Sequence, residues 1–153
     1  NMEKIGLKLG EILQLESEIN GFQNRETGEQ VYKGFIKQNL SIILKYELTE
    51  LSEILINERK KIDGLREELI KKHGEDDGSG SIFVKMFNEV LDEEGNVVSR
   101  SYTENYLKFD EEYSTLLNSE KEIEYPEITK EDLKEAGKSN DDYKVLFKLI
   151  KKD

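Results

Sequence analysis

The sequence contains no cysteine, which excludes disulfides, thiol nucleophiles and cysteine metal sites. It has a single histidine, His73, so one chain cannot form a two-histidine metal site or a histidine pair for acid and base steps. No run of about 18 apolar residues is present, and the first residues lack the apolar core of a secretory signal. We therefore expect a soluble, intracellular protein with no catalytic residues, no metal and no cofactor.

Proline is almost absent as well, and the stretch from Gln30 to His73 has none. Its apolar residues follow a heptad, in which Glu58 is the one polar exception. Such spacing lays a narrow apolar stripe along a long helix, and this stripe needs a partner, either another helix of the chain or a second copy. The predicted interface residues are Leu44, Leu48, Leu51, Leu55, Ile62, Leu65 and Leu69.

The ends of this long helix are predicted from capping signals. Thr27 and Gln30 have the spacing of a capping box, which places the start near Gly28, with a bend or break before Asn39 as the alternative. Gly74 follows the last apolar position and is expected to end the helix in a left-handed cap.

The remaining elements follow from local periodicity and turn residues. The expected elements are a helix from Leu9 that ends near Gly21, a β-hairpin over Ser81–Tyr102 with its turn at Asp92–Asn96, a helix from Thr103 to about Asn118, an extended segment around Pro126, a short helix opened by Thr129 and Asp132, and an amphipathic helix over residues 141–150.

These elements predict an α+β fold that is mostly α, with long antiparallel helices and a β-hairpin after the longest helix. At 153 residues the chain is the size of one domain. Within this single domain we expect a helical hairpin over residues 1–73 and an acidic loop with a β-hairpin over 74–102. Residues 103–153 would hold a helix, an extended segment and a C-terminal amphipathic helix.

The formal charge of −11 is concentrated in the middle of the sequence. Residues 74–135 contain six Lys and Arg against 18 Asp and Glu. A negative field of this kind repels phosphate backbones, so direct nucleic-acid binding is not expected. A membrane partner is not expected either, because the sequence has no long apolar run. Basic proteins or cations are the electrostatic partners that it favours.

One loop invites a calcium interpretation. In Glu75–Met86, Asp77, Ser79 and Gly80 stand at the third, fifth and sixth positions of an EF-hand loop. The twelfth position, however, is Met86 where the bidentate glutamate belongs, and a strand-like run follows in place of a helix. A solvated acidic loop is favoured, and cation binding stays open as the alternative.

Five segments in this order carry a resemblance to a known group: Leu7–Ile12, Glu26–Glu29, Leu65–Gly74, Asp92–Asn96 and Phe147–Ile150. Their layout resembles that of small uncharacterised proteins encoded by tailed bacteriophages and prophages. The resemblance spans most of the chain, but its segments are helix and turn fragments without a chemical signature. It implies a phage origin and a place in the host-cell cytoplasm, and it supplies no site residues.

We therefore predict a non-enzymatic phage accessory protein that acts by protein–protein interaction. Self-association is expected because the helix over Leu9–Phe22 is about half as long as the apolar stripe. The alternative is a phage inhibitor of a host defence system, either an acidic decoy for a nucleic-acid site or a sponge for a small ligand.

Overall fold

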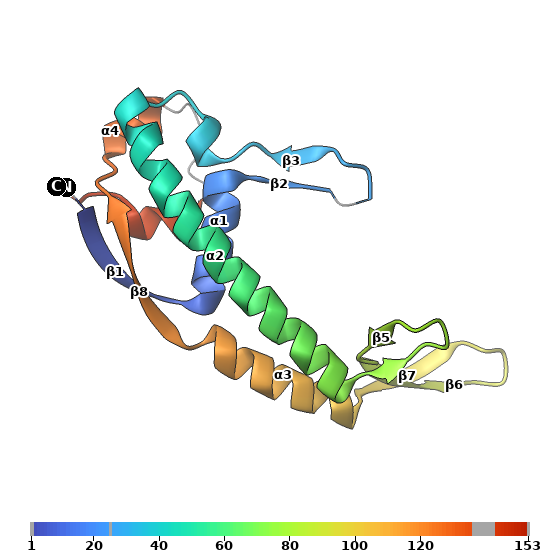
Figure 1. Cartoon of the computed structure of the whole chain (residues 1–153). Coiled ribbons are helices and arrows are strands. Elements are labelled where there is room, and N and C mark those ends of the chain that lie inside the picture. Colours follow the sequence, from blue (N-terminus) through green and yellow to red (C-terminus); the bar gives the residue numbers. More distant parts are fainter. Residues whose placement is uncertain (1, 25, 136–142, 153) are drawn as a thin grey trace. The chain divides into compact units, whose positions relative to one another are not determined.

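The structure, a computed structural model, describes residues 2–24, 26–135 and 143–152. It confirms a mixture of helices and strands, with one long helix and small two-stranded antiparallel sheets (Figure 1). The chain divides into two compact units: unit 1 is Asn1–Lys61 with Ser119–Asp153, and unit 2 is Ile62–Asn118.

The long helix, α2, spans Ile42–His73 and passes from unit 1 into unit 2. Its predicted start near Gly28 is wrong. The Ser41 side chain begins the helix, since its Oγ accepts a hydrogen bond from the Leu44 N–H at 3.2 Å. The residues before it form strand β3 (Gln30–Tyr32) and the 3₁₀ turn η1 (Phe35–Lys37).

The expected capping box is a hairpin turn. Strand β2 (Phe22–Gln23) pairs with β3, and the Thr27 hydroxyl accepts from the Glu29 N–H at 3.2 Å, inside the connecting loop. Gly21 makes this hairpin possible, because a Cβ there would lie 2.3 Å from the Tyr32 carbonyl oxygen. The Thr27 side chain, whose spacing to Gln30 suggested a helix start, therefore belongs to a turn.

Unit 1 is closed by a sheet that joins its two chain segments. Strand β1 (Met2–Lys8) pairs antiparallel with β8 (Glu120–Pro126), and the two ribbons run side by side in Figure 1. The extended segment around Pro126 was predicted, whereas β1 was not. One further backbone bond, from the Leu9 N–H to the Ser119 carbonyl at 2.9 Å, continues the ladder into the helix that follows.

That helix, α1, spans Leu9–Asn20, and its prediction is confirmed. At its start the Glu11 carboxylate accepts from the Lys8 N–H at 3.0 Å, and at its end Gly21 adopts φ 81°. Arg59 of α2 binds α1 through three contacts: its Nε donates to Glu16 Oε1 at 2.9 Å, and its Nη2 donates to the Leu13 carbonyl at 2.8 Å and to Ser17 Oγ at 3.3 Å.

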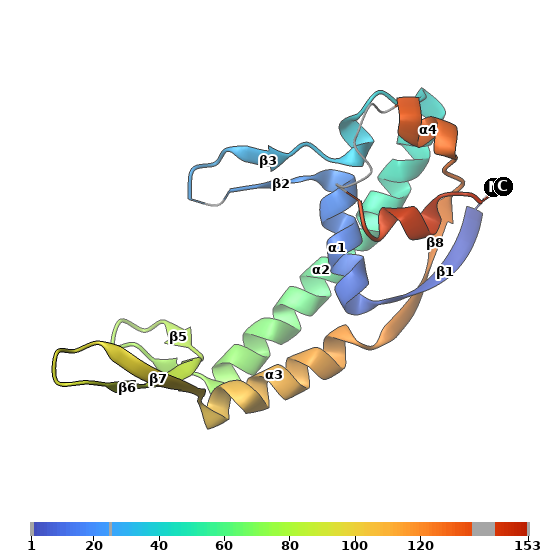
Figure 2. The same ribbon diagram turned by 180° about the vertical axis from the view of Figure 1, so that it is seen from behind.

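The C-terminal part of unit 1 contains two short helices. α4 (Lys130–Glu135) begins at the predicted pair, with two reciprocal bonds: Thr129 Oγ1 accepts from the Asp132 N–H, and Asp132 Oδ2 accepts from the Thr129 N–H. The predicted helix over 141–150 is wrong in extent, because the described part holds only the 3₁₀ helix η3 (Leu146–Leu149), and residues 141 and 142 lie outside the described residues. Figure 2 shows η3, in red, beside α1.

The main hydrophobic core lies entirely in unit 1. It gathers side chains from α1, the first half of α2, the β1–β8 sheet and the C-terminal segment. Its buried members are Leu7, Ile12, Leu15, Ile19, Phe35, Leu44, Leu48, Leu51, Leu55, Ile123, Ile128, Leu133, Tyr143, Val145, Leu146, Leu149 and Ile150.

One carboxylate is buried in this core. Glu18 of α1 is 2% exposed, and its two oxygens accept three backbone hydrogen bonds, from the N–H groups of Lys144 (2.9 Å), Val145 (3.2 Å) and Leu146 (3.0 Å). Backbone donors buried without partners are costly, so this side chain substitutes for the secondary structure that the segment lacks at that point.

Unit 2 consists of the last part of α2, two hairpins and a helix. The first hairpin joins β4 (Glu75–Asp76) to β5 (Ile82–Phe83), and the second joins β6 (Phe87–Leu91) to β7 (Val97–Tyr102). Helix α3 (Glu104–Leu117) begins as predicted at Thr103, whose Oγ1 accepts from the Tyr106 N–H at 3.0 Å.

The predicted hairpin is confirmed over β6 and β7, although its first strand begins at Phe87 and not near Ser81. α2 ends at His73 as predicted, but Gly74 does not have a positive φ. The glycine is required for space, because a Cβ would lie 2.4 Å from the Ile70 carbonyl oxygen and 2.7 Å from that of Phe83.

Glu58, the exception in the heptad, makes unit 1 sensitive to acid. Burial raises the pKa of this carboxyl, but hydrogen bonds from Lys121 Nζ (2.5 Å) and Lys61 Nζ (3.1 Å) outweigh it and hold the pKa below its ordinary value. The unfolded chain then binds the proton more readily. The stabilisation of unit 1 by these bonds is complete at pH values above the ordinary carboxyl pKa. It is lost as the pH falls through the lower pKa that Glu58 has in the folded protein.

We therefore expect Glu58→Gln to flatten the dependence of stability on pH between about pH 5 and 3, the range in which the ordinary glutamate pKa lies. The urea midpoint measured across this range tests the prediction. Glu53→Gln, at an exposed position of the same helix, is the matched control and should keep the wild-type slope. Equal slopes for wild type and Glu58→Gln would contradict the assignment.

Candidate interaction surface

The structure distributes the seven predicted interface residues over both units. Leu44, Leu48, Leu51 and Leu55 belong to the core of unit 1, where the chain itself covers them. In unit 2, Ile62 is also buried, Leu69 is half-buried and Leu65 is 43% exposed. As the chain is folded, the four leucines of unit 1 are not accessible to a second copy.

Unit 2 leaves most of its large apolar side chains in contact with water. Ile62 and Phe109 are its buried hydrophobic residues among those described. The exposed ones are Leu65, Ile82, Phe83, Met86, Val90, Leu91, Val97, Val98, Tyr102 and Leu107. Single exposed apolar residues are common, but a group of this size in a segment of 57 residues marks an interaction surface.

The most exposed of these side chains lie at the tip of the β6–β7 hairpin. The pairing runs from Phe87 opposite Tyr102 to Leu91 opposite Val97, with a bulge next to Val90. Val90, Leu91 and Val98 are 57%, 56% and 61% exposed. We call Val90, Leu91, Val97 and Val98 the hairpin tip.

The turn beyond the hairpin tip is well defined and acidic. Asp92 Oδ1 accepts from the N–H groups of Glu94 (3.0 Å) and Asn96 (2.8 Å), and Gly95 adopts φ 84°. The Asp92 carboxylate is therefore used to shape the turn, whereas Glu93 and Glu94 are exposed. Two carboxylates thus lie beside an apolar tip of fixed conformation.

A ladder of five aromatic rings connects the base of the hairpin to α3. The successive ring centroids are 5.1, 5.2, 6.5 and 5.6 Å apart. Guanidinium groups flank both ends, with Arg100 5.4 Å from the first ring and Arg66 5.9 Å from the last. The rings are Phe87, Tyr102, Tyr106, Phe109 and Tyr113. The ladder holds the hairpin on α3 even though unit 2 has so small a core.

The electrostatics of unit 2 are strongly negative. It contains 6 Lys and Arg against 14 Asp and Glu, a formal charge of −8. One acidic side chain is neutralised locally: Lys72 Nζ donates to Glu112 at 2.7 Å, and His73 Nε2 shares a hydrogen bond with the same carboxylate. The bonds from Lys72 and His73 lower the pKa of Glu112. The lone histidine is thus held by a carboxylate of α3.

The acidic loop that suggested calcium is the turn of the β4–β5 hairpin. Asp76 Oδ1 accepts from the N–H groups of Gly78 and Gly80, and Asp77 Oδ1 accepts from the N–H and hydroxyl of Ser79. These bonds lower the pKa of Asp77, with the Ser79 hydroxyl as the main cause. Within residues 2–24, 26–135 and 143–152, no group of three or more metal-ligating side chains occurs.

Sequence reasoning located the hairpin but did not identify its tip as a surface. The pairs Val90-Leu91 and Val97-Val98 flank the turn, and each places an apolar side chain on both faces of a strand. These adjacent apolar pairs were the signal that could have identified the tip as a surface, because only a second sheet or helix could cover both faces of the hairpin.

Comparison of the chain with models of protein families, with curated proteins and with solved structures gives no match in any of the three. Among the described residues, no helix has the length and apolar character needed to cross a membrane. The surface described above is therefore the basis for a functional assignment.

Proposed function

We propose that the chain is a non-enzymatic protein-binding module, an accessory protein of phage origin, in which unit 1 is the stable scaffold and unit 2 binds the partner. The observation that carries the proposal is the exposed hairpin tip. Val90, Leu91 and Val98 are each more than half exposed on a hairpin that the aromatic ladder holds in place.

The chemistry of the surface defines the partner. An apolar tip next to Glu93 and Glu94, on a unit of charge −8, fits an apolar patch bordered by Lys or Arg. The charges would mainly speed association and set specificity, while burial of the apolar tip would supply most of the affinity. The partner is therefore a protein with a basic rim around an apolar groove.

The test removes the apolar surface and preserves the strands. Threonine retains strand propensity, so Val90→Thr/Leu91→Thr/Val98→Thr should leave the circular dichroism spectrum unchanged. With the chain immobilised and extract of phage-infected host cells applied, we expect wild type to retain a specific protein and the triple variant to bind it at least about tenfold more weakly.

The matched control is Ile42→Thr/Ile43→Thr, which removes two apolar side chains that are even more exposed, on unit 1. This control should bind like wild type. Retention of the same protein by the triple variant would refute the assignment of the tip, and so would loss of binding in the control alone. Light scattering of the purified chain identifies a second copy as the partner if the wild type is a dimer and the triple variant a monomer.

A further inference from the structure

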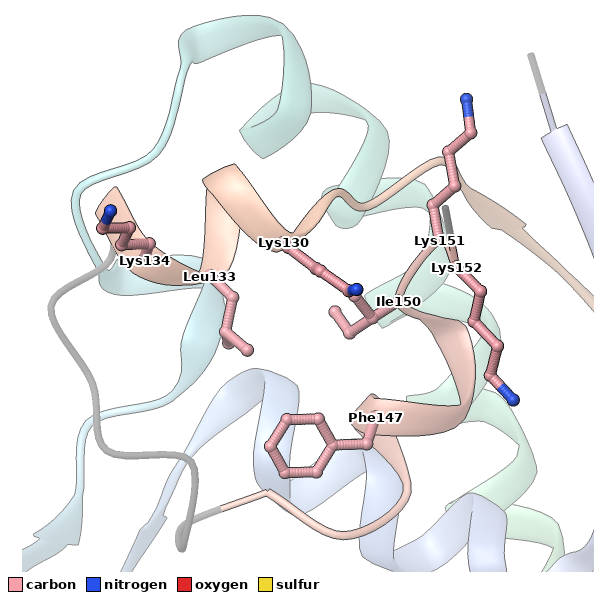
Figure 3. A pocket seen from close by; sticks show the side chains of 7 residues that line it. All are labelled: Lys130, Leu133, Lys134, Phe147, Ile150, Lys151 and Lys152. Carbon is pink, nitrogen blue, oxygen red and sulfur yellow. The ribbon is translucent and has the colours of Figure 1, made fainter.

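A second concave surface lies in unit 1, between α4 and the end of the described chain. Its volume is about 530 Å³, which falls in the range of small-molecule sites. Figure 3 shows the side chains that line it: Lys130, Leu133, Lys134, Phe147, Ile150, Lys151 and Lys152.

Three apolar side chains form the floor of this pocket. Leu133 and Ile150 are buried, and Phe147 is half-buried with its ring edge-on to Tyr143 at 6.4 Å. The backbone beneath is held by a bridge between Ile128 and Ile150 and by the Lys151 N–H, which donates to the Ile128 carbonyl at 2.7 Å. In Figure 3 Leu133 and Phe147 face the same opening, so the floor is preformed.

The other four described residues that line the pocket are lysines, and none of the described lining residues is acidic. This is unusual in a chain with 34 Asp and Glu against 23 Lys and Arg. Two nearby carboxylates are engaged: Asp132 caps α4, and Glu127 binds Lys151, one of the four lining lysines, at 2.7 Å. Among the described residues no carboxylate lies within 4 Å of the amino group of Lys134 or Lys152.

We propose that this pocket binds an amphiphilic anion, a carboxylate or phosphate group attached to an aromatic or aliphatic body. The apolar body would cover the floor, and the anionic group would lie near one of the lysine amino groups, which point in different directions around the pocket in Figure 3. An ammonium group is a compact point charge suited to both carboxylate and phosphate. A bare inorganic anion would leave the floor in water, and a neutral hydrocarbon would desolvate the lysines without compensation. The site is independent of the surface on unit 2.

The probe for the test is 8-anilinonaphthalene-1-sulfonate, an aromatic anion that fluoresces when it leaves water. We expect wild type to bind it, and Lys134→Glu/Lys152→Glu to bind it at least tenfold more weakly. Lys33→Glu/Lys60→Glu makes the same charge change at exposed positions of unit 1 outside the pocket and should bind like wild type. Lys134→Gln/Lys152→Gln, which adds no negative charge, should show an intermediate loss. All variants should retain the wild-type circular dichroism spectrum.

Three further measurements separate the parts of the proposal. Decanoate should displace the probe, whereas inorganic phosphate and decyltrimethylammonium at equal concentration should not. Amide shifts in NMR should appear at residues 130–134 and 146–152. Equal binding by wild type and Lys134→Glu/Lys152→Glu, displacement by the cationic amphiphile, or shifts confined to the β6–β7 hairpin would each overturn the proposal.

The anion can come from solution or from a lipid. Co-sedimentation of wild type, but not of Lys134→Glu/Lys152→Glu, with phosphatidylglycerol vesicles would support a lipid source. Displacement of the probe by decanoate without co-sedimentation would support a soluble ligand. Failure of both would refute the site.

Discussion

Replacing Glu18 with alanine is expected to lower the free energy of unfolding by about 3–5 kcal/mol, because three backbone N–H groups lose the acceptor that the described residues provide for them. Each buried donor left without a partner costs about 1–3 kcal/mol, and some water entry reduces the sum. The segment that these bonds hold supplies Tyr143, Leu146 and Leu149 to the core of unit 1. Its release therefore weakens the whole unit and not only its edge. Urea unfolding at pH 7 measures the effect.

Amide hydrogen exchange locates the change. Protection at Lys144, Val145 and Leu146 should fall in Glu18→Ala before that of α2 does. Glu50→Ala, at an exposed position of α2, is the control and should change stability by no more than about 0.5 kcal/mol. If Glu18→Ala unfolds at the wild-type urea concentration, the carboxylate contributes nothing to holding the C-terminal segment.

Leu55→Lys is expected to unfold unit 1 at every protein concentration, since Leu55 is fully buried among the chain's own side chains. An ammonium group in that position would lie among the apolar side chains of the core, and its desolvation cost is large against the about 5–15 kcal/mol by which a domain is stable. Circular dichroism and sizing at two concentrations tenfold apart measure the result. The absence of any concentration dependence is the signature of a core residue, because loss of a dimer contact would be partly overcome at high concentration.

Leu65→Lys makes the same change at another position of the same heptad, one that is 43% exposed. It should remain folded, with a stability change below about 1 kcal/mol. A folded Leu55→Lys variant with half the molecular mass of wild type would instead place Leu55 at a contact between copies. If only Leu65→Lys changes the mass, self-association uses the part of the heptad that belongs to unit 2.

The elements set by neighbouring residues were predictable from the sequence. The Thr103 cap, the Thr129 and Asp132 pair and the turn after Leu91 each depend on side chains within a few positions, and the structure contains all three. The start of α2 was missed because Thr27 and Ser41 offer the same local signal. The helix begins at Ser41 because the residues after Thr27 form β3. This strand pairs with β2, and its backbone approaches Gly21 so closely that a side chain there would not fit.

Contacts between distant segments were not predictable. The heptad indicated that its leucines need a partner, but not that strands and a 3₁₀ helix of the same chain would cover them together with α1. In the sequence, Glu18 is one more polar position of an amphipathic helix. In the structure, its three hydrogen bonds form with residues more than 120 positions away. The lysine pocket combines a six-residue helix with the end of the described chain, and no single window of sequence contains both.

The pairing of β1 with β8 has a consequence for synthesis on the ribosome. Lys8 pairs with Glu120 and Met2 with Pro126, separations of 112 and 124 positions along the chain. The first strand therefore stays unpaired until residues 120–126 have emerged, by which point all of unit 2 has been synthesised. A nascent chain stalled before residue 119 would expose the open edge of β1 and the part of the unit 1 core that β8 and the C-terminal segment cover, which is the kind of species that chaperones bind and that aggregates.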